Sequence, residues 1–203
     1  MSRFDFTAMP MDSKLQDAFQ FLSEIDRAKT VLRQNVVPPD LRQENDAEHS
    51  WHMAVCAIIL APYYPQPLDL SRCLSMILLH DVVEIDAGDT YCYDGLANWD
   101  KVDRERCAAE RIFGLLGPEG AKWKALWEEF EAGESHEAKF AAIMDRIQPL
   151  LMHMRTGGYA WKTHGIRREQ VEKRNEAAKE QAPALWEAVT AMLDYGQSQG
   201  WLK

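Results

Sequence analysis

The sequence predicts an all-α fold of about seven to eight helices. Apolar residues recur at helical spacing in several segments, whereas no segment shows the sustained alternation of a half-buried strand, and β-branched residues are sparse. Capping residues precede the helical segments, and glycine or proline follows them. We therefore expect one domain over residues 1–203, with a core at about 15–155 and C-terminal helices at about 165–200 that pack on it.

The first half of the chain is expected to hold three helices. The first begins at Asp12 or Ser13 and runs to about residue 32, with Leu15, Phe19 and Leu22 on one face. Prolines at 38 and 39 prevent its continuation, so residues 33–46 are expected to form a loop. The second helix covers 47–61, and the third runs from 72 to about 85, where Gly88 follows.

The second half is expected to hold five helices. An aromatic-rich loop over 91–99 precedes helices at about 100–116, 119–131 and 135–154, each followed by glycine within a few residues. A loop with Tyr159, Trp161 and His164 is expected next. The last two helices are expected at about 168–181 and 183–197.

Charge and cysteine usage limit the possible partners. The formal net charge of −9 disfavours a polymeric nucleic acid as the main ligand, although an anionic small molecule remains possible where local cations offset the repulsion. The four cysteines form no CxxC pair, which favours a reduced, cytoplasmic protein. The N-terminal residues lack the apolar stretch of a signal peptide, and the longest apolar run, 53–62, is too short for a membrane span.

The stretch LLHDVVEIDAGDT at 78–90 is the strongest indication of chemistry. It places five ionisable residues directly after an apolar run: His80, Asp81, Glu84, Asp86 and Asp89. Buried charges must be paired or bound to a metal ion. The stretch therefore predicts half of a metal site.

Two residues elsewhere can supply the other half. His49 lies near the start of the second helix, and Asp145 lies in an apolar part of the sixth, where aspartate is a poor helix former. Alone, His49 would more often be a core histidine, and Asp145 a partner of Arg146 or Arg111. Together with His80 and Asp81 they form a mixed nitrogen and oxygen set that suits a first-row divalent ion.

Spacing separates the remaining residues by role. Glu84 follows Asp81 by three positions on the same helical face, which is where a group that activates water beside a metal belongs. Asp89 is expected to assist it or to orient a ligand, and Asp86 to face solvent or support a histidine. His52 does not complete an HExxH motif, so we expect a structural or supporting role for it.

The ordered set of motifs resembles the HD-domain superfamily of metal-dependent phosphohydrolases. The pattern is a single histidine, an adjacent His-Asp pair and a distant aspartate. The longer matches, ENDAEHS at 44–50, HDVVE at 80–84 and GDT at 88–90, resemble the branch that contains 5′-deoxyribonucleotidases. This resemblance covers roughly residues 15–155.

The resemblance implies hydrolysis of a phosphomonoester, with a deoxyribonucleoside 5′-monophosphate as the leading substrate. It implies one divalent ion (Mn, Co, Ni, Fe, Zn or Mg) and the following roles: metal binding by His49, His80, Asp81 and Asp145, catalysis by Glu84 and Asp89, and phosphate binding by Arg33. In that branch a tryptophan that helps to select deoxyribose follows the arginine, whereas this chain has Gln34.

Other readings stay open at this point. The sequence is also compatible with another HD phosphoesterase activity, on a cyclic nucleotide or a non-nucleotide ester, and with a metal-binding regulatory protein that has lost catalysis. Tyr91 and Trp99 are candidates to stack on a base. A homodimer is expected, for which apolar residues on the first and last helices are available.

Overall fold

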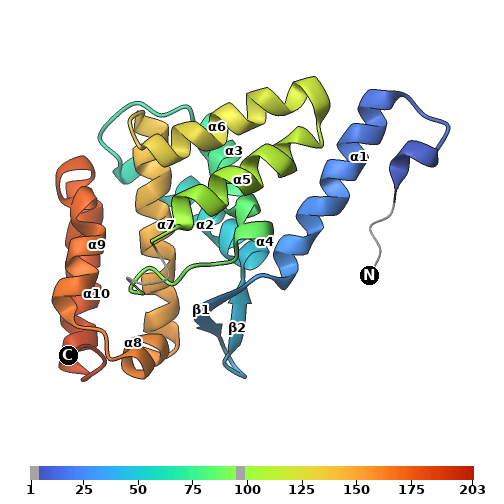
Figure 1. The fold of residues 1–203 in the computed structure, drawn as a ribbon. Coiled ribbons are helices and arrows are strands. Elements are labelled where there is room, and N and C mark those ends of the chain that lie inside the picture. The colour runs from blue at the N-terminus through green and yellow to red at the C-terminus, as the bar shows by residue number, and fades with distance from the viewer. Residues whose placement is uncertain (1–4, 95–98) are drawn as a thin grey trace.

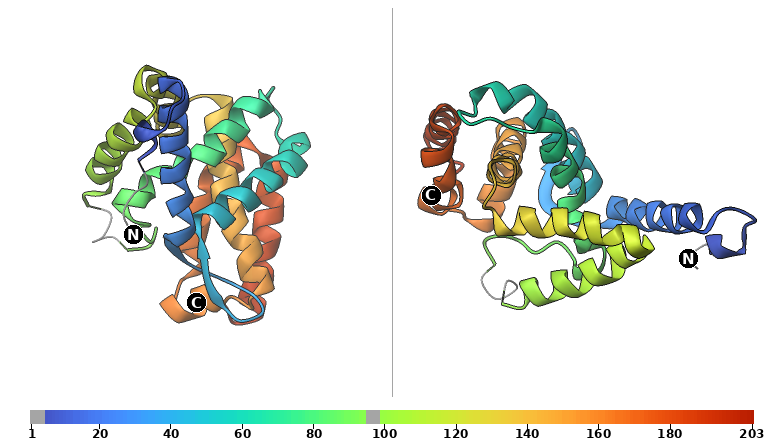
Figure 2. Two further views of the ribbon diagram at one scale, coloured as in Figure 1. Left: turned by 90° about the vertical axis from the view of Figure 1, so that its right-hand side faces the viewer. Right: turned by 90° about the horizontal axis from the view of Figure 1, so that it is seen from above.

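Helix α7 (His136–Arg155) runs through the middle of the molecule, which the computed structural model describes over residues 5–94 and 99–203 (Figure 1). Ser135 caps this helix by accepting a hydrogen bond from the backbone N–H of Ala138. Helices α2 (Asp46–Leu60) and α3 (Leu70–Leu79) pack on one side of α7, and α9 (Arg168–Gln181) and α10 (Pro183–Ser198) lie on the other (Figure 2). The central helix is therefore covered on both sides.

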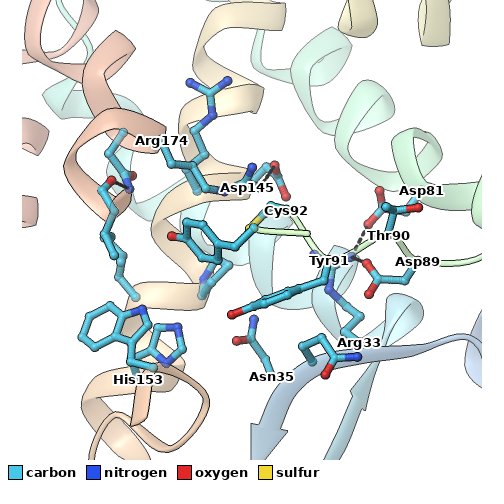
Figure 3. A pocket seen from close by; sticks show the side chains of 18 of the residues that line it. Arg33, Asn35, Asp81, Asp89, Thr90, Tyr91, Cys92, Asp145, His153 and Arg174 are labelled. Atoms are coloured by element: carbon cyan, nitrogen blue, oxygen red, sulfur yellow. Dashed lines mark hydrogen bonds and ion pairs between the residues drawn. The ribbon is translucent and has the colours of Figure 1, made fainter. Parts of the chain in front are cut away.

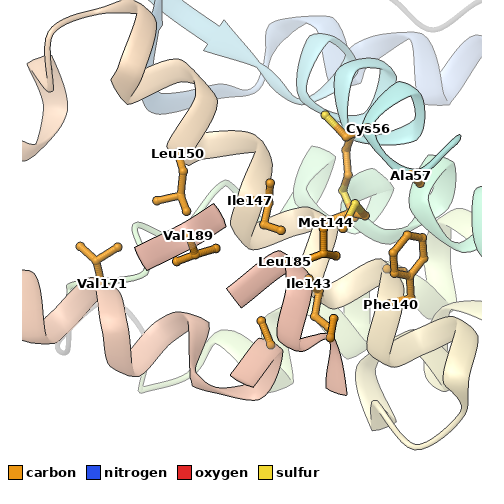
Figure 4. Packing of buried hydrophobic residues seen from close by; sticks show 14 of the residues in the cluster. Cys56, Ala57, Phe140, Ile143, Met144, Ile147, Leu150, Val171, Leu185 and Val189 are labelled. Carbon is orange, nitrogen blue, oxygen red and sulfur yellow. The ribbon is translucent and has the colours of Figure 1, made fainter. Parts of the chain in front are cut away.

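Burial of apolar side chains between these layers forms the main core, which provides the dominant favourable term in folding. Figure 4 shows side chains of α9 and α10 facing those of α7, with α2 on the opposite flank. The buried residues include Ala57, Phe140, Ile143, Met144, Ile147, Leu150, Val171, Leu185, Val189 and Leu193. The C-terminal helices thus share one apolar cluster with the helices that carry the HD motifs.

A second buried cluster holds the short segments around Glu84 in place. Helices α5 (Lys101–Gly114) and α6 (Gly120–Ala132) supply most of it, and Phe21 of α1 (Ser13–Ile25) adds to it. Val82 and Val83 belong to the same cluster. The apolar half of the HDVVE motif is therefore anchored in a core, while its charged residues face the other way.

The expected loop at 33–46 is a β-hairpin, so the prediction of a loop there is wrong. Helix α1 ends at Ile25, a 3₁₀ turn η2 (Asp26–Thr30) follows, and strands β1 (Leu32–Val37) and β2 (Arg42–Asn45) pair antiparallel. The two prolines lie in the turn between the strands, where a ladder N–H is not required. As a consequence, Arg33 lies on a paired strand and not in a free loop.

The third expected helix is interrupted at the HD motif. Helix α3 ends at Leu79, the 3₁₀ turn η4 (His80–Val83) follows, and a short helix α4 (Glu84–Ala87) ends at Gly88, whose φ is 77°. The indole Nε1–H of Trp127 donates to the carbonyl of His80 at 3.2 Å, which satisfies one backbone acceptor at the break. Across this break the carboxylates of Asp81 and Glu84 remain close, with ligand atoms within 4.8 Å of each other.

The eight expected helices are present among the described residues, with the third divided into α3 and the short α4, and the others seen as α1, α2, α5, α6, α7, α9 and α10. The short α8 is additional. Helix α8 (Tyr159–His164) replaces the expected loop there. Trp161 is buried against the main core, which explains why the segment is ordered as a helix. Among the described residues, no helix combines the length and the apolar character that a membrane crossing requires.

Helix α1 extends away from the rest of the molecule (Figures 1 and 2). Its apolar face at Leu15, Phe19 and Leu22 is largely exposed, and only Phe21 and Glu24 of the helix are buried. The outward face of α2 is also apolar and exposed, at Trp51 and Ile59 among others. Two apolar helix faces are therefore open to solvent in the single chain.

Candidate metal centre

Four side chains from three parts of the chain converge beside the break after α3. His49 comes from the first turns of α2, His80 and Asp81 from η4, and Asp145 from the middle of α7. His49 Nε2 lies 3.1 Å from Asp145 Oδ1 and 3.8 Å from Asp81 Oδ2. His80 Nε2 lies 3.1 Å from Asp81 Oδ1 and 4.0 Å from Asp145 Oδ1. The structure thus brings together all four residues that the resemblance assigns to the metal.

The nitrogen atoms of the two histidines are arranged to accept a cation. His80 Nδ1 donates to the carbonyl of Ile77 at 2.7 Å, so its Nε2 faces the carboxylates, and this buried atom makes no hydrogen bond. His49 Nδ1 contacts Gln148 Oε1 at 2.9 Å, which likewise directs Nε2 inward. Ligand atoms of His49, His80 and Asp81 all lie within 4.8 Å of one another. Two imidazoles and two carboxylates therefore fit a divalent transition-metal ion.

Charge pairing dominates the electrostatics of this group. Burial opposes the charged form of His80, but the charges of Asp81 and Asp145 outweigh it and raise the pKa of His80 to about 9. Burial also opposes the ionised form of Asp81, yet His80 and Arg33 hold the pKa of that carboxyl below its usual value. In the absence of an ion, protons on histidine supply part of the positive charge that the carboxylates require.

Two further carboxyls lie beside Asp81. Ligand atoms of Asp46, Asp81 and Glu84 also lie within 4.8 Å of one another. Asp46 Oδ2 and Glu84 Oε2 are buried without a hydrogen-bond partner. Burial and the neighbouring charge of Asp81 raise the pKa of Asp46 to about 7 and raise the pKa of Glu84 well above its ordinary value. A buried acid with a raised pKa in a pocket is typical of a proton-transferring group.

Arg33 is a cation in contact with this acidic group. Its Nη1 donates to Asp81 Oδ2 at 2.8 Å and lies 3.7 Å from Asp89 Oδ1 and 3.9 Å from Glu84 Oε2. Asp89 follows the left-handed Gly88 and is 11% exposed at its side chain, so it borders both Arg33 and open space. The three residues expected to handle water and phosphate therefore lie together next to the candidate metal ligands.

These groups line one pocket of about 180 Å³ between α7, α9 and the segment after Gly88. Figure 3 shows Asp81, Asp89 and Arg33 on one side of the pocket and Asp145 and Arg174 on the other, with Tyr91 between them. Arg174 Nη2 lies 3.5 Å from Asp145 Oδ2. Two further cations, Lys101 and Arg146, also line the pocket. The remaining lining residues are uncharged: Gln34, Asn35, Thr90, Cys92, Tyr93, Pro149, Leu150, His153, Trp161, Val171 and Asn175. The pocket thus has a charged end and an uncharged end, in which aromatic and aliphatic side chains lie beside a few amides.

The supporting residues divide as follows. Asp86 forms ion pairs with Arg111 and, at 3.7 Å, with Arg27, on the side of α4 away from the pocket. It therefore supports no histidine.

His52 Nδ1 lies 3.1 Å from Gln148 Nε2, behind His49. Tyr91 lines the pocket, whereas Trp99 is 84% exposed and does not.

Sequence reasoning missed Asp46, Gln148 and Arg174. Asp46 is the first residue of α2, inside a capping box formed by Asn45 and Glu48, so the pattern NxxE could have pointed to it. Gln148 lies one helical turn after Asp145. Its contact with His49 joins residues 99 positions apart, so it becomes visible only in the folded chain. Arg174 belongs to a helix that reads as a solvated charged face, and its approach to Asp145 depends entirely on tertiary packing.

Comparison with known proteins places the fold and motifs in a family. The HD domain family matches residues 25–186. The human 5′-deoxynucleotidase HDDC2 is 33% identical over 135 residues, which is 65% of this chain and 64% of that protein, and its mouse counterpart is 32% identical over 65% and 66%. The chain therefore spans about two thirds of the length of these relatives.

Solved structures support the same assignment. A crystal structure of a predicted metal-dependent phosphohydrolase from Magnetospirillum magnetotacticum is 45% identical, covers 94% of this chain and 96% of its own, and superimposes with a TM-score of 0.86. The PH0347 protein of Pyrococcus horikoshii shares the fold at 18% identity, over 89% of this chain and 99% of its own, with a TM-score of 0.62. With the family match over residues 25–186, these findings show that the chain belongs to the HD domain family.

Proposed function

We propose that the protein is a metal-dependent phosphohydrolase that releases phosphate from a small phosphomonoester, with a (deoxy)nucleoside 5′-monophosphate as its leading substrate. The observation that carries this proposal is the convergence of His49, His80, Asp81 and Asp145 beside a pocket that also holds Arg33 and Glu84. The names of the human relative and of the Magnetospirillum structure support the same reaction class.

The four converging residues would hold one divalent ion. The ion, when bound, would supply Lewis-acid stabilisation of the negative charge on the phosphoryl group. The pKa of the buried Glu84 is raised, which suits a group that takes a proton from the attacking water and returns it. Its Oε2 makes no hydrogen bond and is available for that contact.

Arg33 and Asp89 would act on the substrate itself. The guanidinium of Arg33 is held near the ligands by β1 and can donate to phosphoryl oxygens, where positive charge stabilises the transition state. Asp89 can accept a hydrogen bond from a sugar hydroxyl or orient the leaving oxygen, because it lines the pocket beside Arg33. The aromatic and aliphatic end of the pocket suits a nucleoside more than a small polar alcohol.

The proposal is tested by phosphate release. Metal-free protein is supplied in turn with Mn²⁺, Co²⁺, Ni²⁺ or Mg²⁺ and incubated with deoxyribonucleotides, ribonucleotides, cyclic nucleotides and sugar phosphates. We expect release from nucleoside 5′-monophosphates with at least one of these ions. Phosphate release from another ester alone would contradict the proposed nucleotide substrate. Phosphate release from no compound would contradict the proposed reaction.

We also propose that the chain acts as a single domain and as a homodimer in the cytoplasm. The apolar faces of α1 and α2, exposed at Leu15, Phe19, Leu22, Trp51 and Ile59, support a second copy as their cover. The cysteines are free thiols, which fits a reducing compartment. Light scattering coupled to size-exclusion chromatography tests the dimer, and a monomer at micromolar concentration would contradict it.

A further inference from the structure

Gln148 is a fully buried amide that bridges the candidate metal centre and the hairpin. Its exposed fraction is 0%, and it lies on α7 one turn after Asp145. Its Oε1 contacts His49 Nδ1 at 2.9 Å. Its Nε2 donates to Glu44 Oε1 at 2.7 Å and lies 3.1 Å from His52 Nδ1. Every polar atom of this side chain is therefore engaged.

The chemistry of these partners fixes the direction of each hydrogen bond. A carboxylate only accepts, so the amide nitrogen of Gln148 must face Glu44, and its oxygen must face His49. An amide oxygen also only accepts, so Nδ1 of His49 carries the hydrogen. The remaining ring nitrogen, Nε2, is then the atom that faces Asp145 and Asp81.

From this arrangement we infer that Gln148 is a positioning residue for the metal centre: it holds His49 in the orientation and tautomer that present Nε2 to a cation, and Glu44 holds Gln148. The inference rests on the proposed role of His49 as a metal ligand. A histidine ligand needs one bare nitrogen, and a hydrogen-bond acceptor on the other nitrogen both fixes the ring and raises its basicity.

Glu44 contributes charge as well as position. It is 2% exposed, and its second oxygen, Oε2, makes no hydrogen bond. In a low-dielectric interior, hydrogen bonds in a chain polarise one another, so the carboxylate of Glu44 strengthens Gln148 Oε1 as an acceptor for His49. We call this hydrogen-bonded chain of Glu44, Gln148 and His49 the relay. Through it, the carboxylate on β2 polarises the imidazole of His49.

Burial alone does not account for Gln148. Neighbouring positions on α7 that face the same core are apolar, such as Ile147 and Leu150. A buried amide costs free energy unless every polar atom finds a partner, so the burial of Gln148 depends on its polar contacts and not on core packing. Its three partners are Glu44, His49 and His52, of which His49 faces the metal ligands directly.

The test measures Co²⁺ affinity of metal-free protein by isothermal titration calorimetry, independently of turnover. Four variants are compared with the wild type: Q148L, Q148E, the exchanged pair E44Q/Q148E, and L193A. Leu193 is fully buried in α10, a helix that contributes no candidate metal ligand. L193A should therefore destabilise the fold while the hydrogen bonds among Glu44, Gln148 and His49 stay intact. Unfolding by denaturant is measured in parallel.

We expect Q148L to weaken Co²⁺ binding about 10- to 100-fold, since it leaves His49 Nδ1 without an acceptor. Q148E keeps that acceptor but sets two carboxylates against each other, and is expected to bind about 10-fold more weakly. The exchanged pair restores one carboxylate and one amide in reverse order, so its affinity is expected to return to within about threefold of the wild type. L193A should leave the affinity unchanged.

Several results would overturn the inference. Wild-type affinity in folded Q148L would do so, as would an equal loss of affinity in L193A. If Q148L fails to fold, the comparison of Q148E with E44Q/Q148E decides, and a pair that binds no more tightly than Q148E contradicts the relay. If the wild type binds no Co²⁺, the result would instead contradict the proposed metal site itself.

Discussion

Arg33 donates a hydrogen bond of 2.8 Å to Asp81, the aspartate of the HD pair, across a separation of 48 positions in the sequence. The contact joins strand β1 to the turn after α3. If Asp81 binds the proposed metal ion, Arg33 is placed to contact an anionic group bound to the same ion. The hairpin therefore has a direct part in the site.

Replacement of Arg33 tests that relationship. We expect R33A to lower kcat/KM for a nucleoside 5′-monophosphate at least 100-fold, because removal of a charged contact to the transition state costs roughly 3 kcal/mol or more. R33K should recover part of the loss. The matched control is R42A, since Arg42 lies on β2, is 51% exposed at its side chain and pairs with Glu48 outside the pocket. An equal loss in R42A would mean that hairpin stability, not Arg33 chemistry, is responsible.

Glu84 is expected to separate metal binding from turnover. E84Q keeps the shape of the side chain but removes proton transfer, so kcat should fall about 100- to 10,000-fold while Co²⁺ affinity changes little. Steady-state kinetics measures kcat, and isothermal titration calorimetry measures the Co²⁺ affinity. D86N, in the same short helix, should retain most activity because Asp86 pairs with Arg111 away from the pocket. A fully active E84Q would exclude Glu84 as the acid or base.

The metal-free protein should lose stability as the pH rises. The pKa of His80 is raised to about 9 in the folded state, so its contribution is complete below about pH 6.5 and is lost as the pH rises through 9. The pKa of Asp46 is raised to about 7, which acts in the same direction between about pH 4 and 7, because the folded state again binds more protons. Denaturant unfolding at pH 6 and pH 9 measures the change.

For His80 alone the change amounts to about 3 kcal/mol, at 1.36 kcal/mol per pKa unit. Metal binding should show the opposite trend and strengthen with pH, since an ion and a proton compete for the histidine nitrogens. The H80N variant should lose most of the pH dependence between 7 and 9. A metal-free protein that becomes more stable from pH 6 to 9 would contradict these charge assignments.

Two glycines with similar φ angles separate backbone strain from steric overlap. Gly133 has φ 63° and no atom within 4 Å of an added Cβ, so G133A should cost about 1 kcal/mol. Gly158 has φ 65°, but an added Cβ would lie 2.4 Å from Cβ of Trp201, so G158A should cost about 3 kcal/mol or more. Urea unfolding measures both changes. An equal loss in the free energy of unfolding for G133A and G158A would show that Trp201 is not packed at the start of α8.

The helices were predictable because their causes are local. Either Asp69 or Ser71 was a candidate to cap α3, and the structure has Asp69 there; Ser135 caps α7, and Gly133 closes α6 in the left-handed conformation. The metal-ligand candidates were also found from local motifs, since His80 and Asp81 are adjacent. The sequence could not reveal the hairpin, because β1 has polar residues at Arg33, Gln34 and Asn35 in place of an alternating pattern.

Non-local contacts account for the rest of what was missed. Gln148 meets Glu44 across 104 positions, and Arg174 meets Asp145 from a helix whose composition is that of a solvated surface. The interruption at His80 also escaped prediction, since a 3₁₀ turn between two helices keeps a helical pattern of residues. These features depend on how distant elements pack, which periodicity does not encode.

The most direct measurement of the central claim is a crystal structure of the Co²⁺-loaded protein with anomalous scattering recorded at the cobalt edge. The claim predicts a strong anomalous peak bounded by His49 Nε2, His80 Nε2 and carboxylate oxygens of Asp81 and Asp145. A fully loaded crystal with its cobalt elsewhere, or with either histidine turned away from the ion, would contradict it.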